Sequence, residues 1–454
     1  YEYSPFFTGL HDVISGFDPS TGKIILPEPI QLNAQPVAIR AYPFYQDVIV
    51  STQSLGLPDS ITPSAKKDFA PRIGFAWQPF RLKSTVIRGG FGLFWVYAIN
   101  DILGNNFLSP PFIIYDSAVS NTPIPNRTFG DFYLGSPIPS AFGTPSISAA
   151  PIRGRNSYTN EWNLSVQQAL TNRLSLEAGY VGQRGVHLQR RRPVNTPLPG
   201  PGAVQARRPF QRFSGISVGD WDTDSVYHAL QTRVEQRFAR GFTFTAAYTF
   251  SKSIDNNSGY FEAPLNFNDL RRERAVSSFD IPHRFILSYV FELPFRLDRT
   301  FAGGVPKAIL EGWQMSGITT LQSGNSFTPT ISTDRLNIGT GGQRPDRIAS
   351  GKLDSPTIDR WFDPLAFSVP ALYTFGNSSR NILRADGRMS FDFSAAKRTR
   401  LSERVGLQFR AEFFNFFNNV DFGGPVTAID TSSAGRVLGA TASRVIQFGL
   451  KLNY

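Results

Sequence analysis

The chain has 454 residues and is 41% hydrophobic and 13% aromatic, but only 18% of its residues are charged. It contains no cysteine, which excludes disulfides and thiolate sites, and its four histidines lack the spacing of metal ligands. A formal net charge of +11 would suit an anionic partner, but no nucleic-acid-binding motif accompanies it. We therefore expect no metal, no other cofactor and no nucleic-acid partner.

The chain opens on Tyr1-Glu2-Tyr3, which resembles the middle of a strand, without an initiating Met or a signal peptide. We therefore expect a piece of a longer precursor, in which residues 1–71 hold a strand remnant and a long outer loop region. No stretch approaches the ~18 consecutive apolar residues of a membrane helix. If the chain lies in a membrane, it must cross as strands.

Segments that alternate apolar and polar side chains with a period of two predict β-strands. In chain order they are Arg72–Pro79, Thr85–Tyr97, Ser157–Leu170, Leu174–Gln183, Val226–Phe238, Phe242–Ser251, Phe285–Leu293, Trp313–Ser323, Met389–Lys397, Val405–Phe417 and Arg444–Tyr454. The last one turns Ile446, Phe448, Leu450, Leu452 and the terminal Tyr454 to one side. An apolar face of this length is typical of a lipid-facing strand in an outer-membrane barrel.

Short and long connections alternate between these strands. The short ones are 80–83, 171–173, 239–241 and 398–404, with 294–312 as a longer member; the long ones are 98–156, 184–225, 252–284, 324–388 and 418–443. Up-and-down membrane barrels have tight periplasmic turns and extended outer loops, whereas a Greek-key sandwich has no reason to separate its connections in this way. The pattern predicts an all-β protein, an antiparallel up-and-down transmembrane β-barrel, with residues 72–454 as its strands and loops.

The same pattern predicts which face meets lipid. The charged residues Glu161, Arg233 and Arg410 fall on the polar faces of their strands. A Lys or Arg turned to lipid at mid-bilayer would cost ~2–4 kcal/mol, so we expect the polar faces to line an aqueous lumen. A soluble sandwich would instead enclose Phe244 and Phe448 in one dry core.

Two motifs resemble known functional sites, a nucleophile elbow and a calcium-binding loop, but neither meets the structural requirements of its site. Gly215–Gly219 matches a nucleophile elbow around Ser217, but no helix follows it, and we expect a loop without catalysis. Asp220, Asp222 and Asp224 have the spacing of a calcium loop, yet the sixth position is Ser225 and the twelfth is Gln231. A solvated acidic loop is the better interpretation, with no metal site.

Basic clusters on the long-loop side are the candidate ligand-binding residues, together with an aromatic that could stack on a ligand. They are Arg190, Arg191, Arg192, Trp221, Arg271, Arg272 and Arg274. Arginine binds phosphate bidentately, so these side chains could capture an anionic ligand or pair with lipopolysaccharide phosphates. The alternative, which we favour, is a solvated basic loop or one paired with the acidic residues nearby. The aromatics Trp221, Tyr260, Phe261 and Trp361 could likewise stack on a ligand or pack the loops together.

Seven runs in order along the chain resemble one family. They are Phe17–Gly22, Phe69–Trp77, Val86–Gly92, Tyr227–Gln231, Tyr248–Ser253, Arg410–Asn418 and the terminal strand. They resemble the C-terminal half of large TonB-dependent receptors of Gram-negative bacteria, in the subgroup with a carboxypeptidase-regulatory-like domain ahead of the plug. Each run alone is modest, but seven in register are specific.

The resemblance implies location in the bacterial outer membrane, in contact with its lipid, and a barrel of 22 strands that encloses a plug. It also implies uptake of a large nutrient (an oligosaccharide, a peptide or a chelate) driven by the TonB complex, with the plug and the TonB box upstream of Tyr1. The rival functions are a structural or adhesive surface protein, a passive pore and, less well supported, an outer-membrane enzyme.

Overall fold

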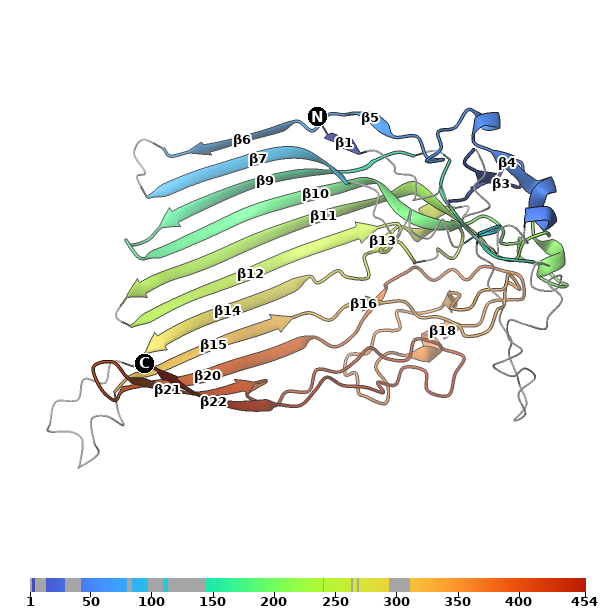
Figure 1. Ribbon diagram of the computed structural model, residues 1–454. Helices are drawn as coiled ribbons and strands as arrows, with labels where there is room; N and C mark the ends of the chain where they lie inside the picture. Colours follow the sequence, from blue (N-terminus) through green and yellow to red (C-terminus); the bar gives the residue numbers. More distant parts are fainter. Residues whose placement is uncertain are drawn as a thin grey trace.

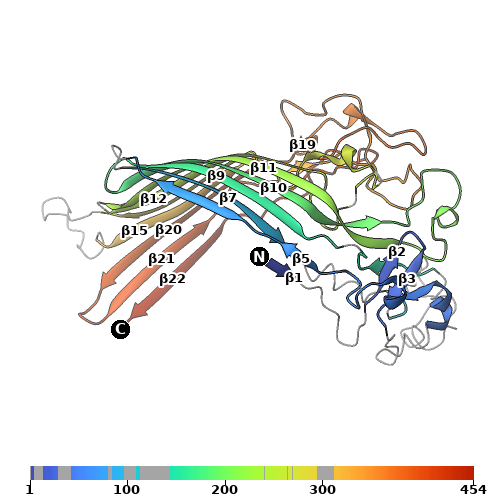
Figure 2. The same ribbon diagram turned by 90° about the horizontal axis from the view of Figure 1, so that it is seen from above.

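The computed structural model describes residues 2–4, 14–28, 42–79, 84–96, 109–112, 144–152, 154–239, 241–262, 264–267, 269–293 and 311–454. Its main feature is one large curved sheet, in which long strands follow each other side by side in chain order (Figures 1 and 2). Among the described residues, the short turns 170–173 and 401–405 lie at one end of this sheet, and the described parts of the long loops lie at the other (Figure 1). We call these the short-turn end and the long-loop end.

Each long strand pairs antiparallel with its neighbours in the sheet, and the outermost strands, β6 and β22, each have one neighbour. The strands are β6 (Arg72–Trp77), β7 (Thr85–Val96), β9 (Ser157–Ala169), β10 (Leu174–Pro193), β11 (Ile216–Ala239), β12 (Phe242–Asp255), β14 (His283–Glu292), β15 (Trp313–Gln322), β20 (Arg388–Arg400), β21 (Gly406–Phe414) and β22 (Val445–Asn453). Two short strands pair beside this path: β8 (Ile147–Ala149) runs parallel to β11, and β13 (Ala275–Val276) antiparallel to β12. All of the predicted strands are present, and the fold class is confirmed.

The register keeps apolar residues together on one face. One row crosses six strands through Phe244, Tyr289, Gly317, Phe393, Phe413 and Ile446. The adjacent row on the opposite face runs through Thr245, Ser288, Ile318 and Asp392. Because a slip of one residue would exchange the faces, this register fixes which side chains meet lipid.

The apolar face is not covered by a second sheet. Phe448 is 68% exposed and Leu450 is 71% exposed. The described clusters of buried hydrophobic residues instead lie at the long-loop end, around Phe17, Ile25 and Phe362. A sandwich with a dry centre is therefore excluded for this part of the chain, and the apolar face is the lipid-facing surface of a transmembrane barrel.

A lysine on the apolar face shows how a charge is tolerated there. Lys397 lies opposite Phe409, on the same face as the apolar rows, but near the short-turn end. Its Nζ donates to the backbone carbonyl of Glu311 at 2.7 Å and lies 5.3 Å from the ring centroid of Trp313. The long side chain thus places its charge beside a carbonyl and an aromatic ring instead of lipid tails.

The hairpin of β10 and β11 is much longer than we predicted. It has 20 residues in one strand and 24 in the other, and its register continues to the pair Pro193–Ser217. The expectation of a loop over 184–225 was therefore wrong for 184–193 and 216–225, including the Asp220–Asp224 acidic run, whereas 194–215 forms the connection. Beyond the bilayer both strand faces carry polar residues, so the alternation that marks a membrane strand disappears while backbone pairing persists.

Other boundaries differ by a few residues. Strand β21 ends at Phe414 and not at Phe417, because Asn415 adopts a positive φ of 56° and its backbone N–H donates to Asp392 Oδ1. The predicted turn 80–83 lies outside the described residues, as do most of the connections 98–156 and 294–312. Tyr1 is also outside them, whereas β1 (Glu2–Ser4) pairs with β5 (Ala65–Asp68).

The N-terminal part forms a small structure at the long-loop end (Figure 2). Strands β2 (Gly16–Asp18), β3 (Lys23–Leu26) and β4 (Ile49–Ser51) form a three-stranded sheet, whose hairpin turn is held by the Asp18 carboxylate. Phe17 of this sheet belongs to the same buried cluster as Ile216 and Val218 of β11. The outer extension of the long hairpin is therefore the support on which these residues pack.

Aromatic rings lie over glycines of neighbouring strands on the apolar face. A Cβ added to Gly317 would stand 2.7 Å from Tyr289 Oη and 2.8 Å from the backbone oxygen of Asp392, and one added to Gly182 would meet the indole of Trp162. These glycines leave room for rings that cover the backbone of the sheet.

We expect Gly317→Ala to destabilise the barrel by about 1–3 kcal/mol, because the new methyl group overlaps the Tyr289 ring and a backbone carbonyl that cannot move alone. The shift from folded to unfolded mobility on heating in SDS gels measures this effect. Gly449→Ala is the matched control, since its Cβ would have Arg410 Nε as nearest neighbour at 4.0 Å. Equal melting of the two variants would contradict the packing argument.

Candidate functional site

Three consecutive arginines, Arg190–Arg192, lie at the outer end of β10, and they differ in their contacts. Two of them pair with carboxylates. Arg190 is fully buried and donates from Nε and Nη2 to the two carboxylate oxygens of Asp222, at 2.5 and 2.6 Å. Arg192 is half-exposed, with Nη1 3.4 Å from Asp220 Oδ2. Both pair across the β10–β11 hairpin, so these two arginines are bound to acids of the next strand.

Arg191 has a different environment. Its Nη2 donates to Ser148 Oγ, and its Nε donates to Tyr260 Oη at 3.4 Å. The guanidinium carbon lies 5.7 Å from the ring centroids of both Tyr260 and Phe261. Among the described residues no carboxylate pairs with Arg191, which separates it from its two neighbours.

The other predicted site residues are placed as follows. Trp221 is only 5% exposed and lies within β11 and not in a loop, which favours packing over stacking on a ligand. Arg274 pairs with Asp224 at 2.9 Å, which joins the second basic cluster to the acidic run of β11. Arg271 has a 97% exposed side chain 3.6 Å from Asp269, and Arg272 is exposed beside it. The structure therefore brings Arg190, Arg192 and Arg274 to one acidic strand and leaves Arg271 and Arg272 in solvent.

A buried charge network that sequence reasoning missed joins two long loops. Arg380 donates to Asp255 Oδ1 at 2.5 Å and to Glu262 Oε1 at 2.8 Å. Arg344 donates to both oxygens of the fully buried Glu273, at 2.6 and 2.9 Å. Burial alone would lower the pKa of Arg380, but the carboxylates of Glu262 and Asp255 outweigh it and raise that pKa above its usual value. Isolated arginines in a Gly- and Pro-containing loop carry no spacing signal that could have predicted these pairs.

Two adjoining cavities open among these loops. The first has a volume of about 430 Å³ and is lined by Arg191, Arg208 and several hydroxyl side chains. The second has a volume of about 280 Å³ and reaches Arg344 and Arg380 of the buried network. Both are lined by Pro193, Thr196, Ile338 and Thr340, so they form neighbouring parts of one hollow region.

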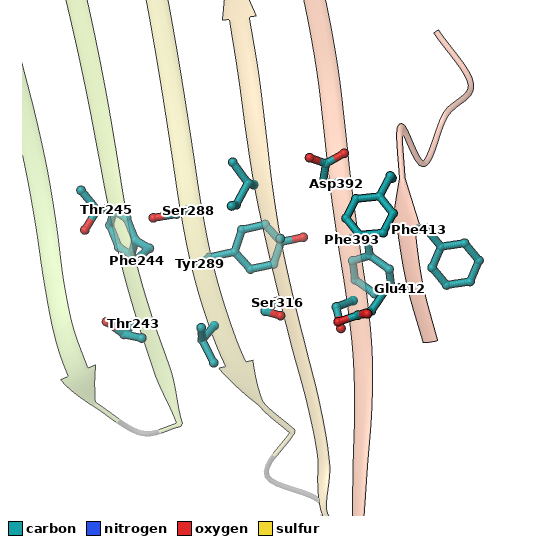
Figure 3. A pocket seen from close by; sticks show the side chains of 15 residues that line it. Thr243, Phe244, Thr245, Ser288, Tyr289, Ser316, Asp392, Phe393, Glu412 and Phe413 are labelled. Carbon is teal, nitrogen blue, oxygen red and sulfur yellow. The ribbon is translucent and has the colours of Figure 1, made fainter. Parts of the chain in front are cut away.

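A third cavity, of about 360 Å³, lies on the sheet itself (Figure 3). The Tyr289 ring extends across the neighbouring strand toward Phe393, while Asp392 and Glu412 come from the polar rows (Figure 3). Its lining belongs to the barrel wall and holds no arginine, lysine or histidine. We therefore take the loop cavities, which contain arginines, as the candidate ligand site in preference to this wall cavity.

The motif around Ser217 is not a nucleophile elbow. Ser217 lies inside β11, opposite Pro193 on one side and Ser148 on the other, and the strand continues to Ala239. The expected loop at this position was therefore wrong. Within the described residues there is no group of three or more His, Asp or Glu side chains that could hold a metal ion, and no helix long and apolar enough to span a membrane.

Comparisons with known proteins agree with this architecture. Residues 1–447 match the family model described as an outer membrane beta barrel domain. The chain belongs to this family and is therefore a protein of the bacterial outer membrane. No curated protein matches the sequence.

Among solved structures, the chain is similar to the outer membrane transporter YddB from Escherichia coli, with a TM-score of 0.51, 12% identity and 85% of this chain covered. It is also similar to the ferripyoverdine receptor of the outer membrane of Pseudomonas aeruginosa, with a TM-score of 0.42, 8% identity and 86% covered. The chain spans 40% of the length of the first protein and 34% of the second. At these identities the likeness concerns the fold.

We expect Arg380→Met to loosen the two joined loops, because it leaves the buried Asp255 without its cation. Removing one partner of a buried pair costs about 3–5 kcal/mol. Cleavage of the 323–387 loop by proteinase K should accelerate in the detergent-purified protein, while the barrel keeps its folded mobility. The control is Arg360→Met, whose exposed pair with Asp363 contributes ~1 kcal/mol or less. Equal cleavage of both variants would refute the network's role.

A second tie between loops should depend on pH. Burial would raise the pKa of Asp430, but N–H and hydroxyl groups of Ser332 and Thr333 donate to its carboxylate and hold the pKa below the usual 3.8. The contact is therefore at full strength above about pH 3.8 and is lost as the pH falls through the lower, folded value. The ratio of pepsin cleavage in this region at pH 2 to that at pH 4 should be larger for the wild type than for Asp430→Asn, because the pH dependence of pepsin itself acts on both alike. Identical pH profiles would contradict the assignment.

Proposed function

We propose that this chain is the barrel wall and outer loops of a TonB-dependent receptor that admits a large nutrient, such as an oligosaccharide, a peptide or a chelate. The observation that carries the proposal is the hollow among the long loops, which stands above a membrane wall with a polar inner face. A ligand site in the loops and a hydrophilic interior are what an uptake protein needs. The transporter similarity in fold supports the same assignment.

In this proposal the long-loop end is extracellular and the short-turn end is periplasmic. Residues 1–71 form part of the outer cover, and residues 72–454 form the wall and its loops. The complete barrel has 22 strands and encloses a plug, and the TonB complex supplies energy through a TonB box in the upstream sequence, with a carboxypeptidase-regulatory-like domain ahead of the plug.

The wall itself carries out no chemistry in this proposal. Ser217, the candidate nucleophile, is engaged in strand pairing on both sides. Catalysis would need a base within hydrogen-bonding reach of a nucleophile, and the two loop cavities bring arginines and hydroxyls together but no histidine.

One observation favours the adhesive or structural alternative. Large apolar side chains are exposed on the loop between β15 and β20, among them Leu365 at 81% and Ile348 at 70%. Exposed apolar patches mark contact sites for other proteins. A surface protein that docks a partner would use such residues whether or not it transports anything.

Uptake by cells that express the complete precursor distinguishes these functions. We expect deletion of the gene to lower uptake of at least one labelled compound from a panel of oligosaccharides, peptides and iron chelates by tenfold or more. A proton uncoupler should lower it equally, because TonB-driven transport needs the inner-membrane gradient. Uptake that resists the uncoupler would indicate a passive pore, and no dependence on the gene would favour the surface protein.

A further inference from the structure

The first loop cavity, the one lined by Arg191 and Arg208, has an unusual charge balance. We call it the arginine chamber. Its lining includes these two arginines and no aspartate or glutamate. In contrast, Arg190, Arg344 and Arg380 each donate to at least one carboxylate. The chamber thus collects two positive charges in a part of the molecule where the other buried arginines are neutralised.

The first of the two charges is held in a fixed position. The backbone N–H of Arg191 donates to the carbonyl oxygen of Tyr260 at 3.1 Å, and its guanidinium bonds Ser148 Oγ and the Tyr260 hydroxyl. Ser148 is itself fixed, because its N–H and carbonyl both bond the hydroxyl of Ser109 at 2.7 Å. These contacts use Nε and Nη2, and no described residue engages Nη1.

The second charge is also positioned by neutral groups. Arg208 donates from Nη1 to the carbonyl oxygen of Asn195 at 2.7 Å and from Nε to Gln205 Oε1 at 3.0 Å. Its surroundings are dry enough that burial lowers its pKa. Within the described chain no carboxylate pairs with it, and its Nη2 lies toward the glycine loop, 3.7 Å from where a Cβ on Gly339 would stand. A partly desolvated cation without a counter-ion is unfavourable, and an anion that enters would relieve it.

The rest of the lining suits a hydroxylated molecule. Side-chain hydroxyls, each able to donate and to accept, surround the chamber from four segments of the chain: Ser146, Ser148, Thr196, Ser217 and Thr340. The volume of about 430 Å³ is within the range of small-molecule sites, and the adjoining cavity of about 280 Å³ leaves space for a longer ligand. The chemistry recognised is therefore an oxyanion combined with hydroxyl groups.

We propose that the arginine chamber binds the carboxylate or phosphate of a hydroxyl-rich small molecule, with Arg191 and Arg208 as paired guanidinium clamps. Arginine is suited to this role because its planar fork matches either oxyanion. The proposal deepens the receptor function above by naming its substrate class. An acidic saccharide and a phosphorylated metabolite share this chemistry.

The test is calorimetric binding to the complete, detergent-purified precursor at low salt, with three probes: digalacturonate, glucose 6-phosphate and neutral maltose. We expect at least one anionic probe to bind ten times more tightly than maltose. Digalacturonate alone would indicate a carboxylate source, and glucose 6-phosphate alone a phosphate source. Failure of both anions to bind more tightly than maltose would overturn the proposal.

Variants locate the binding. Arg191→Gln and Arg208→Gln should each weaken the anionic probe tenfold or more, whereas Arg192→Gln, one residue away and already beside Asp220, should change it less than twofold. If a glutamine variant fails to fold, Thr340→Asp serves instead, because it keeps both arginines and adds a carboxylate at the exposed rim of the chamber. It should abolish anion binding. Unchanged affinity in the folded variants would place the anion elsewhere and refute the site.

The binding experiment and the uptake experiment can fail separately. Anion binding that depends on Arg191 and Arg208, without energised uptake in cells, would reject transport and keep the chamber assignment. Energised uptake together with an affinity that these substitutions leave unchanged would keep the receptor and reject the chamber.

Discussion

The structure depends on one constraint: a backbone N–H or C=O in hydrocarbon must have a hydrogen-bond partner, because an unpaired group costs several kcal/mol. The strands between β6 and β22 satisfy it on both sides, with antiparallel neighbours that follow in chain order. This constraint applies to the backbone of every residue within the bilayer, whatever its side chain. The side chains there therefore determine only which face of the sheet meets lipid. Alternation does this, and the charged exception Lys397 lies where a carbonyl and an aromatic ring replace water.

Beyond the bilayer the same backbone follows different rules. The β10–β11 hairpin continues far past the last alternating residue. In this outer part, ion pairs between the two strands fix the positions of the side chains, whereas contact with lipid does so within the bilayer. The loops are joined by guanidinium–carboxylate pairs that are largely removed from water, in particular those of Arg380 and Arg344. Such pairs add little net stability compared with an apolar core, but each requires one particular partner, so they define one arrangement of the loops.

This arrangement explains how a chain rich in arginine can have both structural and recognition roles. Where a carboxylate is available across a hairpin or from a second loop, the arginine holds the fold together. At Arg191 and Arg208, neutral carbonyls, hydroxyls and rings position the guanidinium instead, which leaves its charge uncompensated. The wall cavity around Tyr289, in contrast, is lined by Asp392 and Glu412 and by no basic residue.

The sequence by itself determined the all-β class, the strands and the two unequal ends, because a membrane strand must alternate in a period that is visible without any knowledge of its partners. It also showed that the basic clusters fall at the long-loop end. The tertiary structure alone decided that Arg190 and Arg192 pair with acids, that Trp221 is buried and that Arg191 and Arg208 line the same cavity. These contacts join residues that are distant in sequence, such as Ser148 with Arg191 and Glu273 with Arg344. Outside the bilayer no periodic pattern in the sequence indicates which residues will be partners.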